Sequence, residues 1–320
     1  MKAIHKNECG SKNTCYCAGA ITEEIKEIYS AIKGRGKKEI FQDSPPSNGL
    51  NNVFRRLDRL IALDICDKRA EEILSSSRFN STFEVLTRFR SLYTAKLEIE
   101  HAKLVLASRD PWRTLRNFAY FPNYVQLART EFQGAGLKPG DRVLFLGSGP
   151  LPLSLIVLCA RYGLRGVGIE RERERAELSR RVLERLGLSG KIEILEGDHF
   201  SLPLKERKER ERNESESERA ELVLVAAQAE PKREIFDHLA AVLPAGTKVS
   251  YRVYEKGLRR LLDTFSGYEL PEHLEEYLRL RPKPPANNTV VFLTTTTQSR
   301  NESLLDLGAE VEAVQKGACC

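Results

Sequence analysis

A glycine-containing turn is the feature of this 320-residue chain that points most directly to chemistry. Residues 143–146 are apolar and predict a buried strand, and residues 151–162 predict an apolar helix. The turn between them consists of Gly147, Ser148, Gly149 and Pro150. Glycines let a ligand approach the backbone closely, and the free N–H groups of a helix N-terminus bind anions. Pro152 stands where the dinucleotide pattern G-x-G-x-x-G has its third glycine, so we expect a nucleotide site that does not take NAD.

Acidic residues follow the next two predicted strands. Glu170 comes directly after the strand at 166–169, and Asp198 and His199 follow the strand after that. Ligands of a doubly wound sheet bind at the carboxyl ends of its strands, so these side chains are expected to face the glycine turn. Glu170 can accept both hydroxyls of a ribose, and Asp198 can accept a hydrogen bond from an amine such as that of adenine. With Ala226 at the end of the next strand, this order resembles the S-adenosylmethionine site of class I methyltransferase folds.

The pattern around these residues alternates between strands and helices from Asp141 onwards. Apolar runs predict strands at 143–146, 166–169, 191–195, 222–226, 248–253 and 289–293. Helices are expected at 151–162, 173–186, 233–242 and 257–265. This alternation is typical of an α/β fold. We therefore predict a Rossmann-like, class I methyltransferase-type sheet over residues 137–298.

The first part of the chain has helical rather than strand periodicity. Apolar residues recur with helical spacing in 21–32, 53–63 and 83–106. We expect an all-helical N-terminal domain over residues 20–136. Residues 1–19, 205–219 and 299–320 lack a core-forming pattern. We predict that they form a disordered N-terminal segment, a solvated charged insertion and a C-terminal tail.

Composition and charge argue against several classes of protein. The 51 basic and 45 acidic residues are well mixed and give a net charge of +6, without the basic stripe of a nucleic-acid-binding protein. No apolar run approaches the ~18 residues of a membrane span, and the N-terminus has no signal-peptide core. The seven scattered cysteines are interpreted as reduced thiols of a cytoplasmic protein, without metal-ligand spacing. We predict small-molecule substrates, no nucleic-acid or membrane partner and no metal site, and the sequence leaves the oligomeric state open.

Several motifs together resemble those of the nicotianamine synthase family. The main match is the loop GSGPLPLS at 147–154. Residues 95–98 resemble a glutamate-bearing helix of that family, and residues 118–124 resemble its aromatic segment FPYxxNY. Further similarities lie at 44–47, 225–227, 238–239, 246, 252–259 and 285–290. The histidine that follows the glutamate in plant-type members is displaced here to His101.

This resemblance implies an enzyme that uses S-adenosylmethionine as a substrate and requires no metal. The 3-amino-3-carboxypropyl group would be transferred to an amine, either glutamate or a growing chain. The product would be nicotianamine or a related metal chelator, and methylthioadenosine would be released.

The resemblance also implies roles for individual side chains. The attacking amine must lose a proton, and Glu98 is the candidate base. Tyr124 and Tyr120 would orient the amine or contact the sulfonium, and Asn123 lies in the same segment and is expected to bind substrate. The substrate α-carboxylate would be held by two arginines, Arg252 and Arg259.

Other interpretations share part of this pattern. A single-transfer, opine-type synthase would act once on an amino acid such as histidine. A small-molecule methyltransferase has the same sheet and ribose acid, but it does not explain the PLPLS turn, and it would release adenosylhomocysteine. A non-catalytic binding module would bind the nucleotide and release neither sulfur product.

Overall fold

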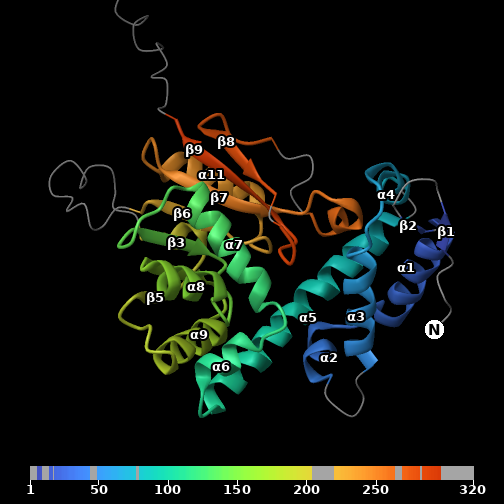
Figure 1. Ribbon diagram of the computed structural model, residues 1–320, viewed down its shortest axis with the longest axis horizontal. Helices are drawn as coiled ribbons and strands as arrows, with labels where there is room; N and C mark the ends of the chain where they lie inside the picture. The colour runs from blue at the N-terminus through green and yellow to red at the C-terminus, as the bar shows by residue number, and fades with distance from the viewer. Residues whose placement is uncertain are drawn as a thin grey trace, which may run out of the picture.

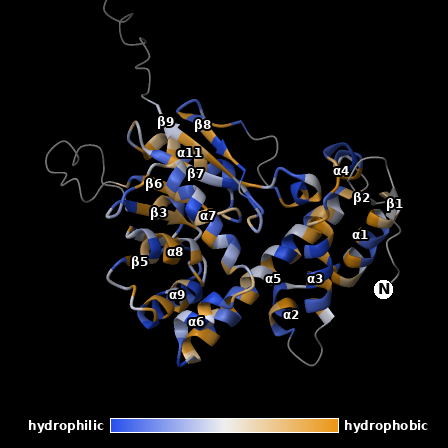
Figure 2. Cartoon of the chain, in the orientation of Figure 1, coloured by the Kyte–Doolittle hydropathy of each residue, from blue (hydrophilic) through white to orange (hydrophobic). Residues whose placement is uncertain are grey.

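A helical part and a sheet part make up the molecule, and the long helix α5 runs between them (Figure 1). The computed structural model describes residues 6–8, 14–16, 18–43, 49–76, 79–203, 220–263, 269–281 and 283–296. The predicted insertion at 205–219 and the predicted tail at 299–320 lie outside the described residues. Hydrophobic residues gather in the central strands and on the inner faces of the helices, whereas the outer faces are hydrophilic (Figure 2).

The helical part forms a core of its own. It contains α1 (Ala18–Ile32), α2 (Lys37–Gln42), α3 (Gly49–Ile61), α4 (Asp67–Leu74) and the first half of α5 (Asn80–Ala107). The isoleucines of α1 recur every three or four residues, so they share one face, which is buried. They pack with Phe54 and Leu57 of α3 and with Leu86, Phe89 and Tyr93 of α5.

A short hairpin precedes α1. Its strands β1 (Lys6–Glu8) and β2 (Thr14–Tyr16) pair in antiparallel fashion, with Lys6 opposite Tyr16. The sequence predicts a disordered segment here, because three-residue polar strands carry no hydrophobic alternation.

The second part is a seven-stranded sheet. Its strands are β3 (Arg142–Leu146), β4 (Arg165–Glu170), β5 (Ile192–Glu196), β6 (Leu222–Val225), β7 (Lys248–Val253), β8 (Leu274–Leu280) and β9 (Thr289–Thr295). They lie side by side in the order β5, β4, β3, β6, β7, β9, β8. β3 to β7 are parallel, and β9 runs antiparallel to β7 and β8. The predicted Rossmann-like sheet with a preceding helical part is confirmed.

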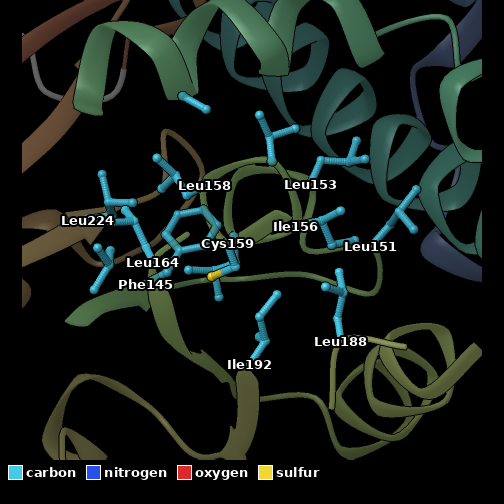
Figure 3. Packing of buried hydrophobic residues seen from close by; sticks show 14 of the residues in the cluster. Phe145, Leu151, Leu153, Ile156, Leu158, Cys159, Leu164, Leu188, Ile192 and Leu224 are labelled. Atoms are coloured by element: carbon cyan, nitrogen blue, oxygen red, sulfur yellow. The ribbon is translucent and has the colours of Figure 1, made fainter. Parts of the chain in front are cut away.

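Among the described residues, three helices lie between the parallel strands: α8 (Leu153–Tyr162), α9 (Arg173–Arg185) and α11 (Lys232–Val242). All residues from 153 to 159 of α8 are buried, because this helix packs against α7 as well as the sheet. An apolar surface on every side is what such an enclosed helix requires. Figure 3 shows Leu153, Ile156 and Leu158 of α8 beside Phe145 of β3.

The helix α5 belongs to both cores. Leu86 and Tyr93 lie in the core of the helical part, whereas Ala102 and Val105 lie in the core of the sheet part. Two further helices, α6 (Pro111–Arg116) and α7 (Phe121–Gly134), also contribute to that second core. Glu98 falls between the two groups of α5 residues and is therefore placed at the junction of the two parts.

Two further elements, β8 and η4 (Gly257–Leu262), differ from the sequence prediction. The strand β8 was not predicted, because its sequence LEEYLRL lies at the sheet edge with mostly exposed side chains and does not alternate. The segment predicted as a helix at 257–265 begins with η4, which is a short 3₁₀ helix. Leu258 and Leu262 of η4 pack into the core of the helical part.

The C-terminal end of α7 lies directly on the sheet. A Cβ atom at Gly134 would overlap the ring of Phe292 in β9, at a separation that real side chains do not adopt. Glycine at this position therefore sets how closely α7 approaches the sheet.

Candidate active site

A cavity of about 750 Å³ lies where α5 and α7 face the carboxyl ends of the parallel strands. This volume is within the range of about 300–1,000 Å³ typical of small-molecule sites. We call the side formed by α5 and α7 the helical wall, and the side formed by the turns after β3, β4, β5 and β6 the sheet wall. The cavity brings together every predicted site residue except Arg259: Glu98, Tyr120, Asn123, Tyr124, Gly147, Ser148, Gly149, Pro150, Glu170, Asp198, His199, Ala226 and Arg252.

The glycine turn follows β3 and forms the middle of the sheet wall. Gly147 and Gly149 have φ angles of 75° and 74°, in the left-handed region that favours glycine. The N–H groups of Gly147 and Ser148 donate to the carbonyl oxygen of Ile169 at 3.0 and 3.1 Å. A Cβ atom at Gly149 would lie 3.2 Å from Oε2 of Glu98. The carboxylate of Glu98 therefore reaches from the helical wall to the backbone of this turn.

Glu170 ends β4 and is buried beside the turn. Its two carboxylate oxygens accept hydrogen bonds from the N–H groups of Gly149 and Glu172, each at 3.0 Å. An ionised carboxylate can accept about four hydrogen bonds. Glu170 therefore retains the capacity to accept the ribose hydroxyls that we expect at this strand end.

Two buried polar atoms of the sheet wall have no partner among the described residues. These atoms are Oγ of Ser148 and Nε2 of His199. Buried polar groups are normally hydrogen-bonded, so unpartnered atoms on a cavity wall fit a polar ligand such as a nucleoside. Asp198, by contrast, accepts the N–H of Phe200 at 2.9 Å and caps the 3₁₀ helix η2 (His199–Ser201).

Phe200 is a cavity residue that the sequence analysis missed. Its side chain is 63% exposed, and its ring centre lies 4.1 Å from that of His199. An exposed aromatic ring on a nucleotide site offers a surface on which a base can stack. The signal in the sequence is an aromatic residue two positions after Asp198, in the loop that follows β5.

Glu98 and Tyr124 form the centre of the helical wall. The hydroxyl of Tyr124 donates to Oε1 of Glu98 at 3.1 Å. Burial raises the pKa of Glu98 to about 7; the Tyr124 hydrogen bond and the charge of Arg175 act against this rise, and the charge of Glu170 adds to it. Burial also holds the pKa of Tyr124 well above its usual range, so its hydroxyl stays protonated. A carboxyl group with this pKa is suited to accept a proton at neutral pH.

Tyr120 and Asn123 lie on the same wall and are oriented by other protein groups. The hydroxyl of Tyr120 donates to Asp58, and Nε of Arg90 donates to the other oxygen of Asp58 at 3.0 Å. Oδ1 of Asn123 accepts the N–H of Asn287 at 3.1 Å. Both side chains line the cavity, and substrate binding by them stays a prediction.

Arg252 lines the cavity, but protein groups occupy one edge of its guanidinium. Nε donates to Oε1 of Glu131 at 2.8 Å, and Nη2 lies 2.7 Å from the same oxygen. Nη2 also donates to Oγ of Ser154 at 2.7 Å. The predicted bidentate contact of Arg252 with a substrate carboxylate would have to use an edge of the guanidinium other than the one formed by Nε and Nη2. The sequence analysis did not connect Glu131 or Ser154 with Arg252, because nothing in their spacing links them to it.

Two other residues singled out in the sequence are placed differently. Arg259 is half-buried and does not line the cavity; burial lowers its pKa, Tyr254 acts against this lowering, and the charge of Arg90 adds to it. Arg90 lines the cavity, although the sequence analysis did not single it out. Nε2 of His101 lies 2.8 Å from the carbonyl oxygen of Thr114, which links α5 to α6.

Lys232 shapes the loop after β6, which also lines the cavity. Its Nζ donates to the carbonyl oxygens of Ala226 and Ala227 at 3.0 Å, and to that of Ala229. Burial lowers the pKa of this lysine to about 8. Lys232 therefore fixes the conformation of this loop by binding the carbonyl oxygens of Ala226, Ala227 and Ala229.

The cavity wall is acidic overall. Seven carboxylates and four guanidinium groups line it, a balance that favours a cationic ligand. In the part of the chain that the structure describes, no group of three or more His, Cys, Asp or Glu side chains is placed to hold a metal ion. Among the described helices, none is both long and apolar enough to cross a membrane.

Sequence similarity identifies the family of this chain. The family described as "Nicotianamine synthase protein" matches residues 15–194 and 206–299. The chain belongs to the nicotianamine synthase family. Nicotianamine synthase 1 of Hordeum vulgare is 38% identical over 169 residues, which is 48% of each chain. Nicotianamine synthase 3 of Oryza sativa subsp. indica is 42% identical over 71 residues, which is 21% of each chain. The chain thus spans about half the length of the barley nicotianamine synthase, and less of the rice protein.

Solved structures of a nicotianamine synthase cover more of the chain. The crystal structure of MtNAS in complex with MTA and tNA is 28% identical, with a TM-score of 0.71 over 89% of this chain and 100% of that chain. A glutamate-to-glutamine mutant of MtNAS in complex with S-adenosylmethionine gives the same values. The predicted family resemblance is therefore confirmed.

Proposed function

We propose that this chain transfers the 3-amino-3-carboxypropyl group of S-adenosylmethionine to an amine, releases methylthioadenosine, and makes nicotianamine or a related metal chelator. The observation that supports this most strongly is the position of Glu98. Its Oε2 lies 3.2 Å from the place that a Cβ of Gly149 would take, and the pKa of this carboxyl is about 7. A proton acceptor thus faces the turn at which the nucleotide substrate is expected.

Glu98 removes the proton that the attacking amine must lose, because an ammonium group is not a nucleophile. S-adenosylmethionine, when bound, supplies the carbon that forms the new C–N bond, while the C–S bond breaks and its electron pair stays on sulfur. Tyr124 keeps the Glu98 carboxylate in place through its hydrogen bond at 3.1 Å. The proton thus ends on Glu98, from which solvent takes it after product release.

Orientation decides which group is transferred. All three carbons attached to a sulfonium are electrophilic, so the site selects one by holding the amine about 3–3.5 Å from it and in line with the sulfur. Glu170 and the glycine turn would fix the ribose, and Ser148 and His199 each offer an unpartnered polar atom beside it. The base stands on the opposite wall, which directs the acceptor amine to the helical side of the sulfur.

The acceptor is proposed to be glutamate or a chain that grows by successive transfers. The likeness to MtNAS, whose crystal structure contains MTA and tNA, supports this assignment over 89% of the chain. The acidic wall also fits substrates that carry an ammonium and a sulfonium group.

We further propose a cytoplasmic enzyme that acts on small molecules without a nucleic-acid partner. The thiols of Cys66 and Cys159 are free, as is usual in a reducing compartment. The basic and acidic residues of the chain are well mixed, unlike those of a nucleic-acid-binding surface.

The test is mass spectrometry of the purified chain incubated with S-adenosylmethionine alone, with glutamate, or with histidine. We expect methylthioadenosine together with a product heavier by one or more aminocarboxypropyl units. Glu98→Gln removes the proposed base and should reduce the yield of both products. Glu100→Gln is its matched control, because Glu100 is an exposed neighbour on α5 that pairs with Lys96 at 2.9 Å. Release of adenosylhomocysteine would identify a methyltransferase, and a single addition to histidine would identify an opine-type synthase.

A further inference from the structure

Glu131 is a fully buried carboxylate to which the proposed mechanism gives no role. It lies on α7, two turns beyond Tyr124, and its exposed fraction is 0%. Its Oε1 accepts the Nε–H of Arg252 at 2.8 Å and lies 2.7 Å from Nη2, while Oε2 has no hydrogen-bond partner among the described residues. All contacts between Glu131 and Arg252 are therefore made by Oε1 of Glu131.

A charge pair at this depth is not by itself evidence of a stabilising role. The cost of taking two charges out of water is comparable to their attraction, and apolar residues of similar volume often replace such pairs without loss. The position of the pair beside the cavity therefore calls for another explanation.

Arg252 brings its charge close to the reacting groups. Its guanidinium lies 5.9 Å from the ring centre of Tyr124 and 5.8 Å from that of Phe145. The hydroxyl of the same Tyr124 donates to Glu98. One aromatic ring therefore separates Arg252 from the base that is expected to face the amine and the sulfonium.

Other arginines of the cavity wall are also paired with carboxylates. Nε of Arg90 lies 3.0 Å from Oδ1 of Asp58, and Nε of Arg175 lies 3.3 Å from Oε2 of Glu172. Glu98, in contrast, accepts its hydrogen bond from an uncharged hydroxyl. Three of the four arginines that line the cavity therefore have a carboxylate partner, and Arg252 is the one whose partner is fully buried.

We propose that Glu131 is a positioning residue that acts through Arg252: it balances the charge of Arg252 so that a sulfonium can bind beside Tyr124. This inference rests on the proposed function, because it takes the substrate to be S-adenosylmethionine. Without Glu131, the guanidinium would be an unbalanced cation at a low-dielectric wall and would repel the sulfonium. A neutral thioether of the same shape would not be repelled.

S-adenosylhomocysteine is the matched probe, since it has the nucleoside and amino acid of the substrate but an uncharged sulfur. Calorimetry at pH 8 gives the Kd of both compounds for the full chain and its variants. We expect Glu131→Gln to raise the Kd of S-adenosylmethionine about tenfold and that of S-adenosylhomocysteine less than about threefold. Glutamine keeps the size of the side chain but not its charge. Ser154→Ala removes an uncharged partner of Arg252, so it should leave the ratio of the two Kd values unchanged.

A charge-balanced double variant separates this role from a structural one. Glu131→Gln with Arg252→Gln removes both charges, and we expect the ratio of the two Kd values to return to that of the unaltered chain. Arg252→Gln alone leaves an unbalanced carboxylate and should shift the ratio in the opposite direction, which provides a test even where Glu131→Gln does not fold.

Equal weakening of both compounds by Glu131→Gln, or no recovery in the double variant, would overturn the inference alone. Failure of the unaltered chain to bind either compound would instead overturn the proposed function.

Discussion

The two walls of the cavity hold their functional groups in different ways. On the sheet wall, backbone geometry positions the groups: the N–H of Gly149 binds Glu170, and left-handed glycines shape the turn. On the helical wall, side chains hold one another, as Tyr124 holds Glu98 and Asp58 holds Tyr120. We therefore expect the sheet wall to govern affinity for the nucleotide substrate and the helical wall to govern the chemical step.

The largest expected effect is that of Glu98→Gln on turnover. Loss of a general base typically reduces the rate by about 10²–10⁴, so we expect kcat for methylthioadenosine release to fall by that factor. The Kd of S-adenosylmethionine should change less than about tenfold, because Glu170 and the glycine turn are intact. Steady-state kinetics and calorimetry measure the two quantities. If the affinity for S-adenosylmethionine fell by as large a factor as kcat, the helical wall would govern binding as well as the chemical step, and the proposed difference between the walls would be wrong.

Gly149→Ala tests the opposite wall. Alanine is strained at a φ of 74°, by roughly 1–2 kcal/mol, and its Cβ would lie 3.2 Å from Glu98. We expect the Kd of S-adenosylmethionine to rise about tenfold. Gly187→Ala is the matched control, since Gly187 has a φ of 71° and no atom lies within 4 Å of the place that its Cβ would take. This control should lose stability by a similar amount and keep its affinity, and a similar loss of affinity in both variants would contradict the prediction.

Tyr124→Phe should change the pH dependence of the chemical step. The Tyr124 hydrogen bond lowers the pKa of Glu98, so its removal should move the acidic limb of the kcat profile to higher pH from a starting value of about 7. The loss of one hydrogen bond should also reduce kcat about five- to tenfold. Tyr120→Phe is the control, because its hydroxyl binds Asp58 and not Glu98. An acidic limb that stays in place in Tyr124→Phe would show that Glu98 is not the titrating base.

The smallest expected effect is on stability. The pKa of the Glu98 carboxyl is about 7 in the folded chain, whereas its ordinary value, which we take for the unfolded chain, is 4.5. The Glu98 carboxyl therefore binds its proton more tightly in the folded chain. Its contribution to folding is therefore present below pH 4.5 and is lost as the pH rises through 7. Glu98→Gln avoids this loss and should be more stable than the unaltered chain at pH 8.5 by on the order of 1 kcal/mol, with little gain at pH 5. Urea unfolding at both pH values measures this, and an equal gain at both would point to packing instead of charge.

The sheet wall was largely predictable from the sequence. Its residues lie in the turn or loop directly after each strand, so the apolar runs that predict the strands also place Gly149, Glu170 and Asp198 at one edge. Phe200 was not predicted as a site residue, because its exposure to the cavity depends on the conformation of η2 after β5.

The helical wall was less predictable, because its contacts join distant parts of the chain. Glu131 and Arg252 are 121 residues apart, and Tyr120 and Asp58 are 62 apart, so no local spacing signals either pair. Glu98 was proposed through family resemblance, since α5 packs on two cores and therefore lacks a single apolar face.

Gly134 gives the helical wall an unexpected dependence on the sheet. The helix that carries Asn123, Tyr124 and Glu131 touches β9 through a position that has no side chain, with Phe292 filling the space. An added methyl group there would require either the Phe292 ring or the helix to shift, and a shift of the helix would be felt by the residues that it carries. The placement of the side chains on this helix therefore depends on a position of the sheet contact that does not line the cavity.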